Sequence, residues 1–311
     1  LHILKRNKNM AGQKAHFSGM EPRFLSGVLE IPVYHMRGGT STGIVLLDEH
    51  LPKDMALREE LIRHLMGVPL EGVVSGNKQI TGLGRGIPQS CKVFIVSTSD
   101  RDDADIDSTL AQLAPSKATI DWSVNCGNMS STLPIFALEI GLISLNSGQS
   151  RVRIYNTNTG VVTHALIDVP KPGKPMATNA EIPGVMGKWP GVQLALLEPA
   201  GSKTGMLLPT GNAKDNFNGI DASCVDLAVP MVIANASAFG KTAREKPADL
   251  DADKEFMEKL RNLWTAAGLA MKLKNAQGNA LKPDELAVSE TIPKACIISK
   301  ANAQERERGA N

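Results

Sequence analysis

The chain has 311 residues, of which 42% are hydrophobic and 21% are charged, as in a folded globular protein. Its length exceeds that of one compact core of ordinary size and favours two domains. Because 34 Lys+Arg nearly balance 32 Asp+Glu, and no stretch approaches the roughly 20 apolar residues of a membrane span, the sequence supports neither a nucleic-acid nor a membrane partner.

The first 27 residues are rich in Lys, Gly and Ser and lack periodicity, which predicts a disordered leader over 1–27. The basic residues Lys5, Arg6 and Lys8 are not followed by an apolar signal core, so we expect a soluble, cytoplasmic protein. A mitochondrial presequence is the weaker alternative, because this stretch has only two arginines and no evident amphipathic helix.

The first domain is predicted to begin with a hairpin, in which strands over 31–36 and 44–47 flank a glycine-rich loop. Asp54 can cap the helix that follows, and Gly67 can end it. Two β-rich runs come next, at 91–97 and 118–122.

Residues 129–140 are apolar on nearly every side, which predicts a helix in the middle of the domain. Gly141 should stop this helix. Pro134 should kink it or shorten its first turns, because proline removes one backbone donor.

A second domain is indicated by a shift toward strand and turn composition at about residue 148, which gives domains of 28–148 and 149–311. Asn158-Thr-Gly160 predicts the turn of a hairpin between 151–155 and 161–167. The later predicted elements are a strand over 192–197, an apolar run over 225–234, a helix over 251–273 and a strand over 295–298.

Two glycine-rich loops could bind an anion. Gly38–Gly43 is not a Walker loop because Ile44 begins a strand where Lys and Ser or Thr should stand, and Gly82–Gly86 is followed by Pro88 instead of a helix. Both loops could still present N–H groups to a carboxylate, with Arg37 or Arg85 adding charge. From the residues alone, glycines that merely serve tight turns are an equally good interpretation.

Cys126 and Lys92 are the candidate reactive side chains. Cys126 precedes the apolar helix, where backbone N–H groups favour a thiolate or a bound anion, although an isolated cysteine is more often a small buried residue. Lys92 stands in a strand beside Cys91, so alternation should send the two side chains to opposite faces. In a partly desolvated cleft near Cys126, Lys92 would become a useful base, whereas most strand lysines are solvated.

Metal and serine chemistry have less support. The four cysteines are far apart in the sequence and His35, His64 and His164 lack ligand spacing, so we expect reduced thiols and no metal site. No Gly-x-Ser-x-Gly motif is present.

These motifs together resemble the PrpF family, which includes isomerases of methylaconitate, methylitaconate and aconitate and the 4-oxalomesaconate tautomerase. The similarity is carried by segments from both domains, among them Met36-Arg-Gly-Gly-Thr-Ser41, Ser90-Cys-Lys92, Asn125-Cys-Gly-Asn-Met129, Asn156-Thr-Asn-Thr-Gly160, Lys203-Thr-Gly205 and Cys224-Val-Asp226. It implies an α+β, diaminopimelate-epimerase-like fold of two similar lobes, each a β-barrel-like sheet around a central helix.

The resemblance also implies an activity. It is a cofactor-free proton transfer that moves or inverts a C=C bond in a small unsaturated di- or tricarboxylate, with no cofactor and no metal. Lys92 and Cys126 match the family's catalytic lysine and cysteine. The implied substrate-binding residues are Arg37, Gly38, Gly39, Thr40, Ser41, Lys78, Arg85, Ser90, Asn125, Gly127 and Asn128.

Some positions depart from the family pattern. Thr42 replaces a basic residue and Thr81 an aspartate, while Arg85 replaces a glycine and could compensate. The Asp102–Asp107 segment most resembles the tautomerase branch but is typical of an acidic surface turn.

The family continues beyond the strand at 295–298, so we expect the second lobe to be incomplete at the C-terminus. A second chain, as in a homodimer, could supply the missing element. Two alternatives to the isomerase stay open. One is an amino-acid epimerase or racemase of the same fold, which needs two opposed cysteines and finds only Cys224 in the second domain. The other is an inactive, truncated carboxylate-binding homologue.

Overall fold

The computed structural model describes residues 21–301 except 173, 175, 183, 276, 277, 290 and 291. It divides the chain into two compact units, Leu1–Leu197 and Glu198–Asn311. The strands of the first unit are β1 (Arg23–Leu25), β2 (Val28–Glu30), β3 (Tyr34–Gly38), β4 (Ser41–Leu47), β5 (Lys92–Thr98), β6 (Ile106–Leu113), β7 (Ile120–Asp121), β8 (Gly148–Asn156), β9 (Val161–Val169) and β10 (Val192–Leu196). Its helices are α1 (Met55–Met66), α2 (Gly127–Ser130) and α3 (Leu133–Glu139), with short 3-10 turns η1 (Asp48–His50) and η2 (Pro88–Ser90).

Part of the predicted leader is structured. Residues 1–20 lie outside the described residues, but β1 pairs with β2 in an antiparallel hairpin. Its two-residue turn is Ser26-Gly27, where both residues have positive φ, 53° and 80°. That geometry suits the right-handed twist of the strands and needs a glycine or a small polar residue.

The main sheet of the first unit has eight strands, in the order β10-β9-β8-β6-β5-β4-β3, with β7 paired to β6. The predicted hairpins are present as β3–β4 and β8–β9. Because β8 also pairs in parallel with β6, strands β8, β9 and β10 belong to this same sheet. The compact units divide at Leu197, whereas the sequence pattern suggested a domain boundary at about residue 148.

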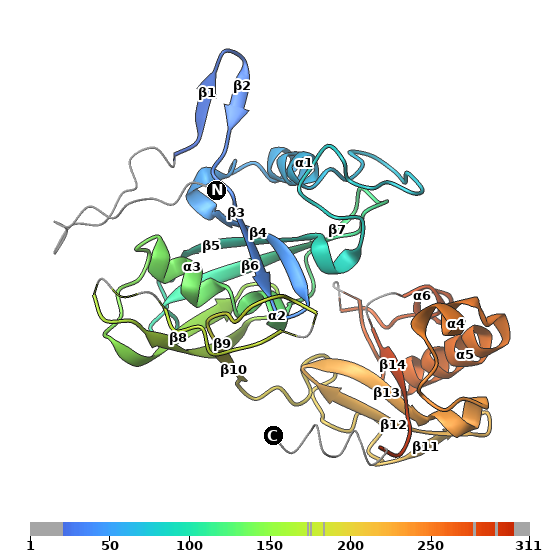
Figure 1. Ribbon diagram of the computed structural model, residues 1–311. Coiled ribbons are helices and arrows are strands. Elements are labelled where there is room, and N and C mark those ends of the chain that lie inside the picture. Colours follow the sequence, from blue (N-terminus) through green and yellow to red (C-terminus); the bar gives the residue numbers. More distant parts are fainter. Residues whose placement is uncertain are drawn as a thin grey trace. The chain divides into compact units, whose positions relative to one another are not determined.

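Helices cover both faces of this sheet (Figure 1). On the face we call the α1 face, α1 packs through Ile62 and Met66 against residues that include Ile44, Val93 and Ile95. The opposite face, the α3 face, packs against α2 and α3 through side chains such as Phe94, Val96, Ile106, Leu110, Met129, Leu133, Phe136, Val152, Ile154 and Ile167. Successive residues of one strand thus enter two different cores, as strand alternation requires.

The ends of α1 agree with their sequence signals. The Asp54 carboxylate accepts a hydrogen bond from the Leu57 N–H at 2.9 Å, and Gly67 ends the helix in the left-handed conformation. The predicted helix over 129–140 is broken instead into α2 and α3, with Pro134 in the first turn of α3. Proline is tolerated in a first turn because the N–H that it lacks has no intrahelical partner there.

The second unit has a core of its own. Its sheet has the order β11-β12-β13-β14, and α5 packs on it through Phe256, Leu263 and Ala267. The strands are β11 (Asp215–Phe217), β12 (Ile220–Leu227), β13 (Val229–Asn235) and β14 (Lys294–Ile298), and the helices are η3 (Ala236–Phe239), α4 (Pro247–Ala252), α5 (Lys254–Ala270) and α6 (Pro283–Ala287).

The predicted helix over 251–273 is in fact split. Asp253 ends α4 and caps α5 by accepting a hydrogen bond from the Phe256 N–H at 3.0 Å. A capping side chain favours a new helix start at this point. None of the helices in the described part of the chain is long and apolar enough to cross a membrane. The predicted α+β class is confirmed.

Candidate active site

Cys126 stands at the start of α2, on the α3 face of the first unit. It is the N-cap residue in an extended conformation, and its side chain makes no capping hydrogen bond. Its Sγ lies 3.7 Å from the hydroxyl oxygen of Ser41, which is buried at the start of β4. The side chain of Asn125 accepts hydrogen bonds from the Cys126 N–H at 2.7 Å and from the Ser130 hydroxyl at 3.3 Å, which fixes the turn before the helix.

The glycine-rich loop packs directly on this turn. A Cβ on Gly38 would lie 1.9 Å from the backbone oxygen of Asn128, and one on Gly39 would lie 2.7 Å from that residue's side-chain oxygen. The Asn128 amide also donates to the Thr40 hydroxyl at 2.9 Å. Only glycine permits such an approach of two backbones, so the motif brings the β3–β4 turn against the start of α2.

Lys92 points to the same face of the sheet as Cys126. It is the first residue of β5, in which Phe94 and Val96 face α2 and α3 while Val93 and Ile95 face α1. By alternation Lys92 shares the face of Phe94, and Cys91 lies in the core under α1. Lys92 is only 8% exposed, which is unusual for a lysine.

Gly43, on the neighbouring strand β4, runs against Lys92. A Cβ there would lie 2.3 Å from the Lys92 backbone oxygen and 3.0 Å from its Cβ. The glycines of this loop therefore serve close packing around Lys92 and Asn128, so the interpretation as mere turn glycines is too narrow.

Gln112 is a further polar residue on this face that the sequence did not single out. It lies opposite Lys92 in the antiparallel β5–β6 pair, and the Lys92 ammonium donates to its side-chain oxygen. Lys92 and Gln112 are 20 residues apart in sequence, and only the register of β5 against β6 makes them neighbours. No local sequence pattern could therefore have identified Gln112.

Arg37, one of the predicted carboxylate anchors, follows the alternation of β3. Tyr34 and Met36 pack on the α3 face and Val33 on the α1 face, so Arg37 leaves β3 toward the α1 face. Burial together with the charge of Arg85 lowers the pKa of His35, a residue of the same strand. The carboxylate-binding roles of Arg37 and Arg85 stay predictions.

Lys78 and Ser90 belong to the loop between α1 and β5, which is organised around Gln79. The buried amide of Gln79 donates to the Met66 carbonyl at 2.8 Å and accepts from the Gly86 N–H at 2.8 Å. Ser90 donates to the Ile87 carbonyl at 2.9 Å. In this loop Gly84 contacts the Gln79 side chain and Gly82 contacts Gly67, so these glycines close the loop on itself.

Asn158 explains part of the Asn156–Gly160 motif. Its amide accepts from the Leu110 N–H at 2.7 Å and donates to the carbonyls of Leu110 and Trp122 at 2.9 and 2.7 Å. It thus fastens the β8–β9 turn to β6 and to the segment that enters the Cys126 turn.

The other cysteines are poor nucleophiles. Burial, partly offset by a hydrogen bond to Gln79, raises the pKa of the Cys91 thiol to about 11. Burial and then the charge of Asp215 raise the pKa of Cys224 to about 11, and Cys224 is fully buried in the core of the second unit. A raised pKa leaves the neutral thiol, which is unreactive at neutral pH.

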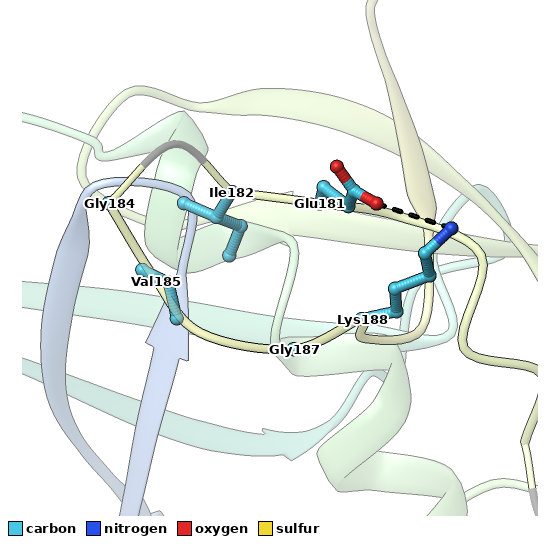
Figure 2. Close-up of a pocket in the computed structure, with 6 residues that line it drawn as sticks. All are labelled: Glu181, Ile182, Gly184, Val185, Gly187 and Lys188. Atoms are coloured by element: carbon cyan, nitrogen blue, oxygen red, sulfur yellow. Dashed lines mark ion pairs between the residues drawn. The ribbon is translucent and has the colours of Figure 1, made fainter.

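A hollow of about 470 Å³ lies away from these residues (Figure 2). It is lined by Glu181, Ile182, Gly184, Val185, Gly187 and Lys188, and Lys188 pairs with Glu181 at 3.2 Å. None of the predicted site residues lines it. Among the described residues, no group of three or more His, Cys, Asp or Glu side chains is placed to hold a metal ion.

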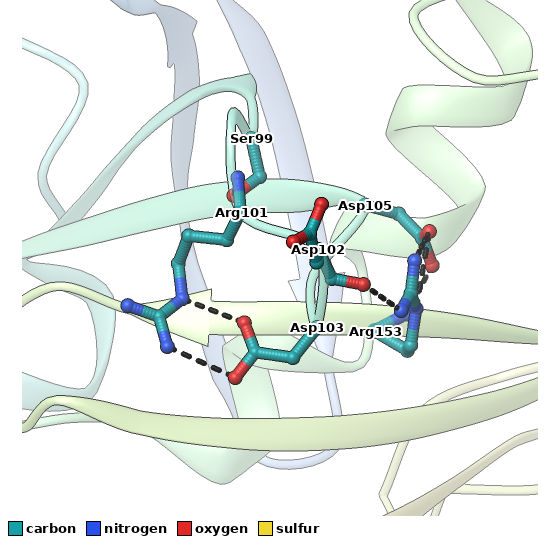
Figure 3. Close-up of polar contacts among 6 residues, drawn as sticks. All are labelled: Ser99, Arg101, Asp102, Asp103, Asp105 and Arg153. Carbon is teal, nitrogen blue, oxygen red and sulfur yellow. Dashed lines mark hydrogen bonds and ion pairs between the residues drawn. The ribbon is translucent and has the colours of Figure 1, made fainter.

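The acidic Asp102–Asp107 segment is part turn and part strand: residues 102–105 precede β6, and Ile106 and Asp107 begin it. Figure 3 shows the contacts of the turn. Arg101 pairs with Asp103 through two bonds of 2.7 and 2.9 Å. Arg153 of β8 binds the Asp105 carboxylate at 2.7 Å and the Asp102 carbonyl at 2.6 Å. The contacts of Arg153 fasten the turn to β8. Each of the two carboxylates has an arginine partner, Arg101 for Asp103 and Arg153 for Asp105.

Comparisons with known proteins agree with the motifs. The chain is 40% identical to the putative isomerase YbhH of Escherichia coli over 88% of its own length and 73% of that protein. It is 32% identical to the 4-oxalomesaconate tautomerase of Pseudomonas putida, over 88% of this chain and 71% of that one.

A solved structure is also similar. The crystal structure of methylitaconate-delta-isomerase matches with a TM-score of 0.68 and 30% identity, covering 86% of this chain and 67% of that one. The predicted fold and enzyme class, an isomerase, are confirmed by these relatives. Since the family profile described as PrpF protein matches residues 28–311, this chain belongs to the PrpF family.

Proposed function

We propose that this protein isomerises a small unsaturated di- or tricarboxylate by moving a proton between two carbons, without a cofactor. Lys92 would be the base and Cys126 the partner acid. The observation that carries the proposal is that a buried lysine of β5 and the cysteine before α2 share one face of the sheet, in a family whose named members are isomerases.

The reaction needs no oxidant. The neutral Lys92 amine would take the allylic proton, and the electron pair of the broken C–H bond would delocalise through the C=C bond into the carboxylate as a dienolate. The Cys126 thiol would then deliver a proton to the far carbon, which shifts the double bond and leaves Lys92 as an ammonium and Cys126 as a thiolate. Transfer of one proton from the ammonium to the thiolate, directly or through water, restores both groups, so one proton and one double bond have moved.

The charge that develops on the substrate carboxylate needs donors. The first turn of a helix leaves backbone N–H groups outside the intrahelical hydrogen bonds, and we assign this role to the turn at Gly127 and Asn128 with the adjacent Gly38–Ser41 loop. Arg37 has no part in this scheme, because alternation along β3 turns it toward the α1 face.

The epimerase alternative has less support. That chemistry uses two cysteines, and Cys224 is a fully buried thiol with its pKa raised to about 11. A second base in the second unit would have to be another residue.

The test is direct. The purified protein is incubated with cis-aconitate, methylitaconate and 4-oxalomesaconate in deuterium oxide, while ultraviolet absorbance and proton exchange are followed. We expect exchange or conversion of at least one substrate, and its loss in Lys92→Met with folding retained. Near-normal turnover by Lys92→Met would sink the assignment of the base, and absence of exchange with all three substrates would overturn the proposed activity.

A further inference from the structure

Gln112 is the cross-strand neighbour of the candidate base Lys92. It stands directly opposite Lys92 across the β5–β6 pair, and its own alternation places it with Ile106 and Leu110 on the α3 face. The side chains of Lys92 and Gln112 are therefore cross-strand neighbours on one face, where such pairs interact most strongly.

The amide of Gln112 is held in one orientation. Its nitrogen donates to the backbone carbonyls of Leu113 at 2.8 Å, Pro88 at 3.1 Å and Cys91 at 3.3 Å. A carbonyl can only accept, so the amide nitrogen must face these three oxygens. The amide oxygen is thereby left on the side of Lys92, and it accepts the hydrogen bond from Nζ.

The choice of an amide has a chemical consequence. An amide oxygen orients an amine without carrying a full negative charge, whereas a carboxylate in its place would stabilise the ammonium form of Lys92. A base must be neutral when it takes a proton, so an uncharged acceptor suits it and a charged one does not.

We propose that Gln112 is a positioning residue for Lys92: its backbone-anchored amide holds Nζ on the face that carries Cys126 with an uncharged acceptor. The inference rests on the proposed function only in taking Lys92 as the base. Gln112 touches no reacting atom in this scheme and acts through Lys92 alone.

Other titratable groups could influence Lys92, and the test has to separate them. On the same face these are Tyr34 of β3, Cys126 before α2 and Asp121 of β7, which lies opposite Gln112 in the β6–β7 pair and accepts from the Ser123 N–H and hydroxyl. Cys91 is the neighbour of Lys92 in sequence. Substitutions at Gln112 leave all four residues in place.

The experiment measures the protonation of Lys92 itself. Folded protein is labelled with limiting acetic anhydride at a series of pH values, and acetylation of Lys92 is quantified by mass spectrometry, since only the neutral amine reacts. Gln112→Glu should move the midpoint upward by at least about one pH unit, and Gln112→Met, which removes the acceptor, should move it downward.

The matched control is Gln193→Glu, which makes the same change at an exposed position on β10 of the same sheet. It should leave the midpoint where it is. In turnover, Gln112→Glu should move the rising limb of kcat/KM to higher pH, and a midpoint that rises by about one pH unit should lower kcat/KM at neutral pH about tenfold. If Gln112 had only a structural role, its substitutions would lower the yield or the melting temperature. The acetylation midpoints of Lys92 in wild type, Gln112→Glu and Gln112→Met would then show no consistent order.

The two proposals fail separately. Equal Lys92 midpoints in wild type and in whichever Gln112 variants fold would overturn the positioning role, even if Lys92→Met is inactive. Ordered midpoints in a protein whose Lys92→Met variant turns over normally would instead uphold the positioning of Lys92 and overturn its role as the base.

Discussion

The two faces of the eight-stranded sheet are built from the same strands and carry opposite chemistry. On the α1 face, Cys91 is fully buried and donates to Gln79, whose amide is itself bonded on both sides. On the α3 face, Cys126 is half-buried with a 3.7 Å contact to Ser41, and Lys92 meets Gln112. The adjacent residues Cys91 and Lys92 thus belong to a closed structural network on one face and to the candidate site on the other.

A short polar motif can therefore hold residues with unrelated roles. The Ser90-Cys-Lys92 segment is continuous in sequence, yet its middle residue completes a core and its last residue faces the candidate site. Substitutions on each face can test this division, and the largest effect is expected at the cysteines.

Replacing Cys126 and Cys91 by alanine, one at a time, should show the largest difference between the roles of the two faces. Cys126→Ala should lower kcat by at least about 100-fold with little change in melting temperature, because it removes the proposed acid from a half-buried position. Cys91→Ala should keep turnover within a few-fold but lower the free energy of unfolding by about 1–2 kcal/mol. Activity assays and urea denaturation measure both, and the opposite pattern would place the chemistry on the α1 face.

Alkylation should distinguish the same two thiols without any substrate. At pH 8 a thiol of pKa about 11 is ionised in roughly one molecule per thousand. Because both thiols are also fully buried, Cys91 and Cys224 should react with iodoacetamide more slowly than the half-buried Cys126. Their rates should then rise about tenfold per pH unit toward pH 11, since a raised pKa delays ionisation to higher pH. Peptide mass spectrometry identifies the first site, and early labelling of Cys91 in folded protein would contradict the closed network.

Replacing Gln79 should damage the fold more than the site. Gln79→Leu leaves the Met66 carbonyl and the Gly86 N–H without their partner, which should lower the free energy of unfolding by about 3 kcal/mol. Gln193→Leu, at an exposed position, should change it by less than about 0.5 kcal/mol. Urea melts of both variants give the difference, and equal losses would show that the network on the α1 face contributes little.

The smallest effect is expected at Arg153, whose neighbours Val152 and Ile154 face α3 while it points the other way. Burial opposes ionisation of Asp105, but the hydrogen bonds from Arg153 outweigh it and lower the pKa of that carboxyl. Because its pKa is lowered on folding, the Asp105 carboxylate stabilises the folded protein at pH values above its pKa in the unfolded chain, about 4. This stabilisation is lost as the pH falls below that value and through the lowered pKa of the folded protein.

Arg153→Gln should therefore destabilise the protein slightly at pH 7, because the pair is partly exposed and screened by solvent. The loss should be smaller at about pH 2.5, since protonation of Asp105 removes the ionic part of the contact and leaves the bond to the Asp102 carbonyl. Melts at the two pH values check this. A cost that persists unchanged at low pH would mean that Arg153 acts through packing.

Local signals in the sequence predicted several elements because their cause is local. Asp54 and Gly67 mark the ends of α1, and Asn158-Thr-Gly160 marks the β8–β9 turn. The break at Pro134 was also foreseeable, since proline lacks its donor wherever it stands. The helix start at Asp253 was missed because Asp251 offers the same capping chemistry two residues earlier.

The sequence by itself determined the family, the candidate pair Lys92 and Cys126, and the opposite facing of Cys91 and Lys92, because motifs and strand alternation are local properties. Tertiary structure decided the rest. Which face Arg37 takes, which strand lies beside Lys92 and where the first unit ends depend on the register and order of strands far apart in sequence. That pairing follows from packing both faces of the sheet at once, and no single segment encodes it.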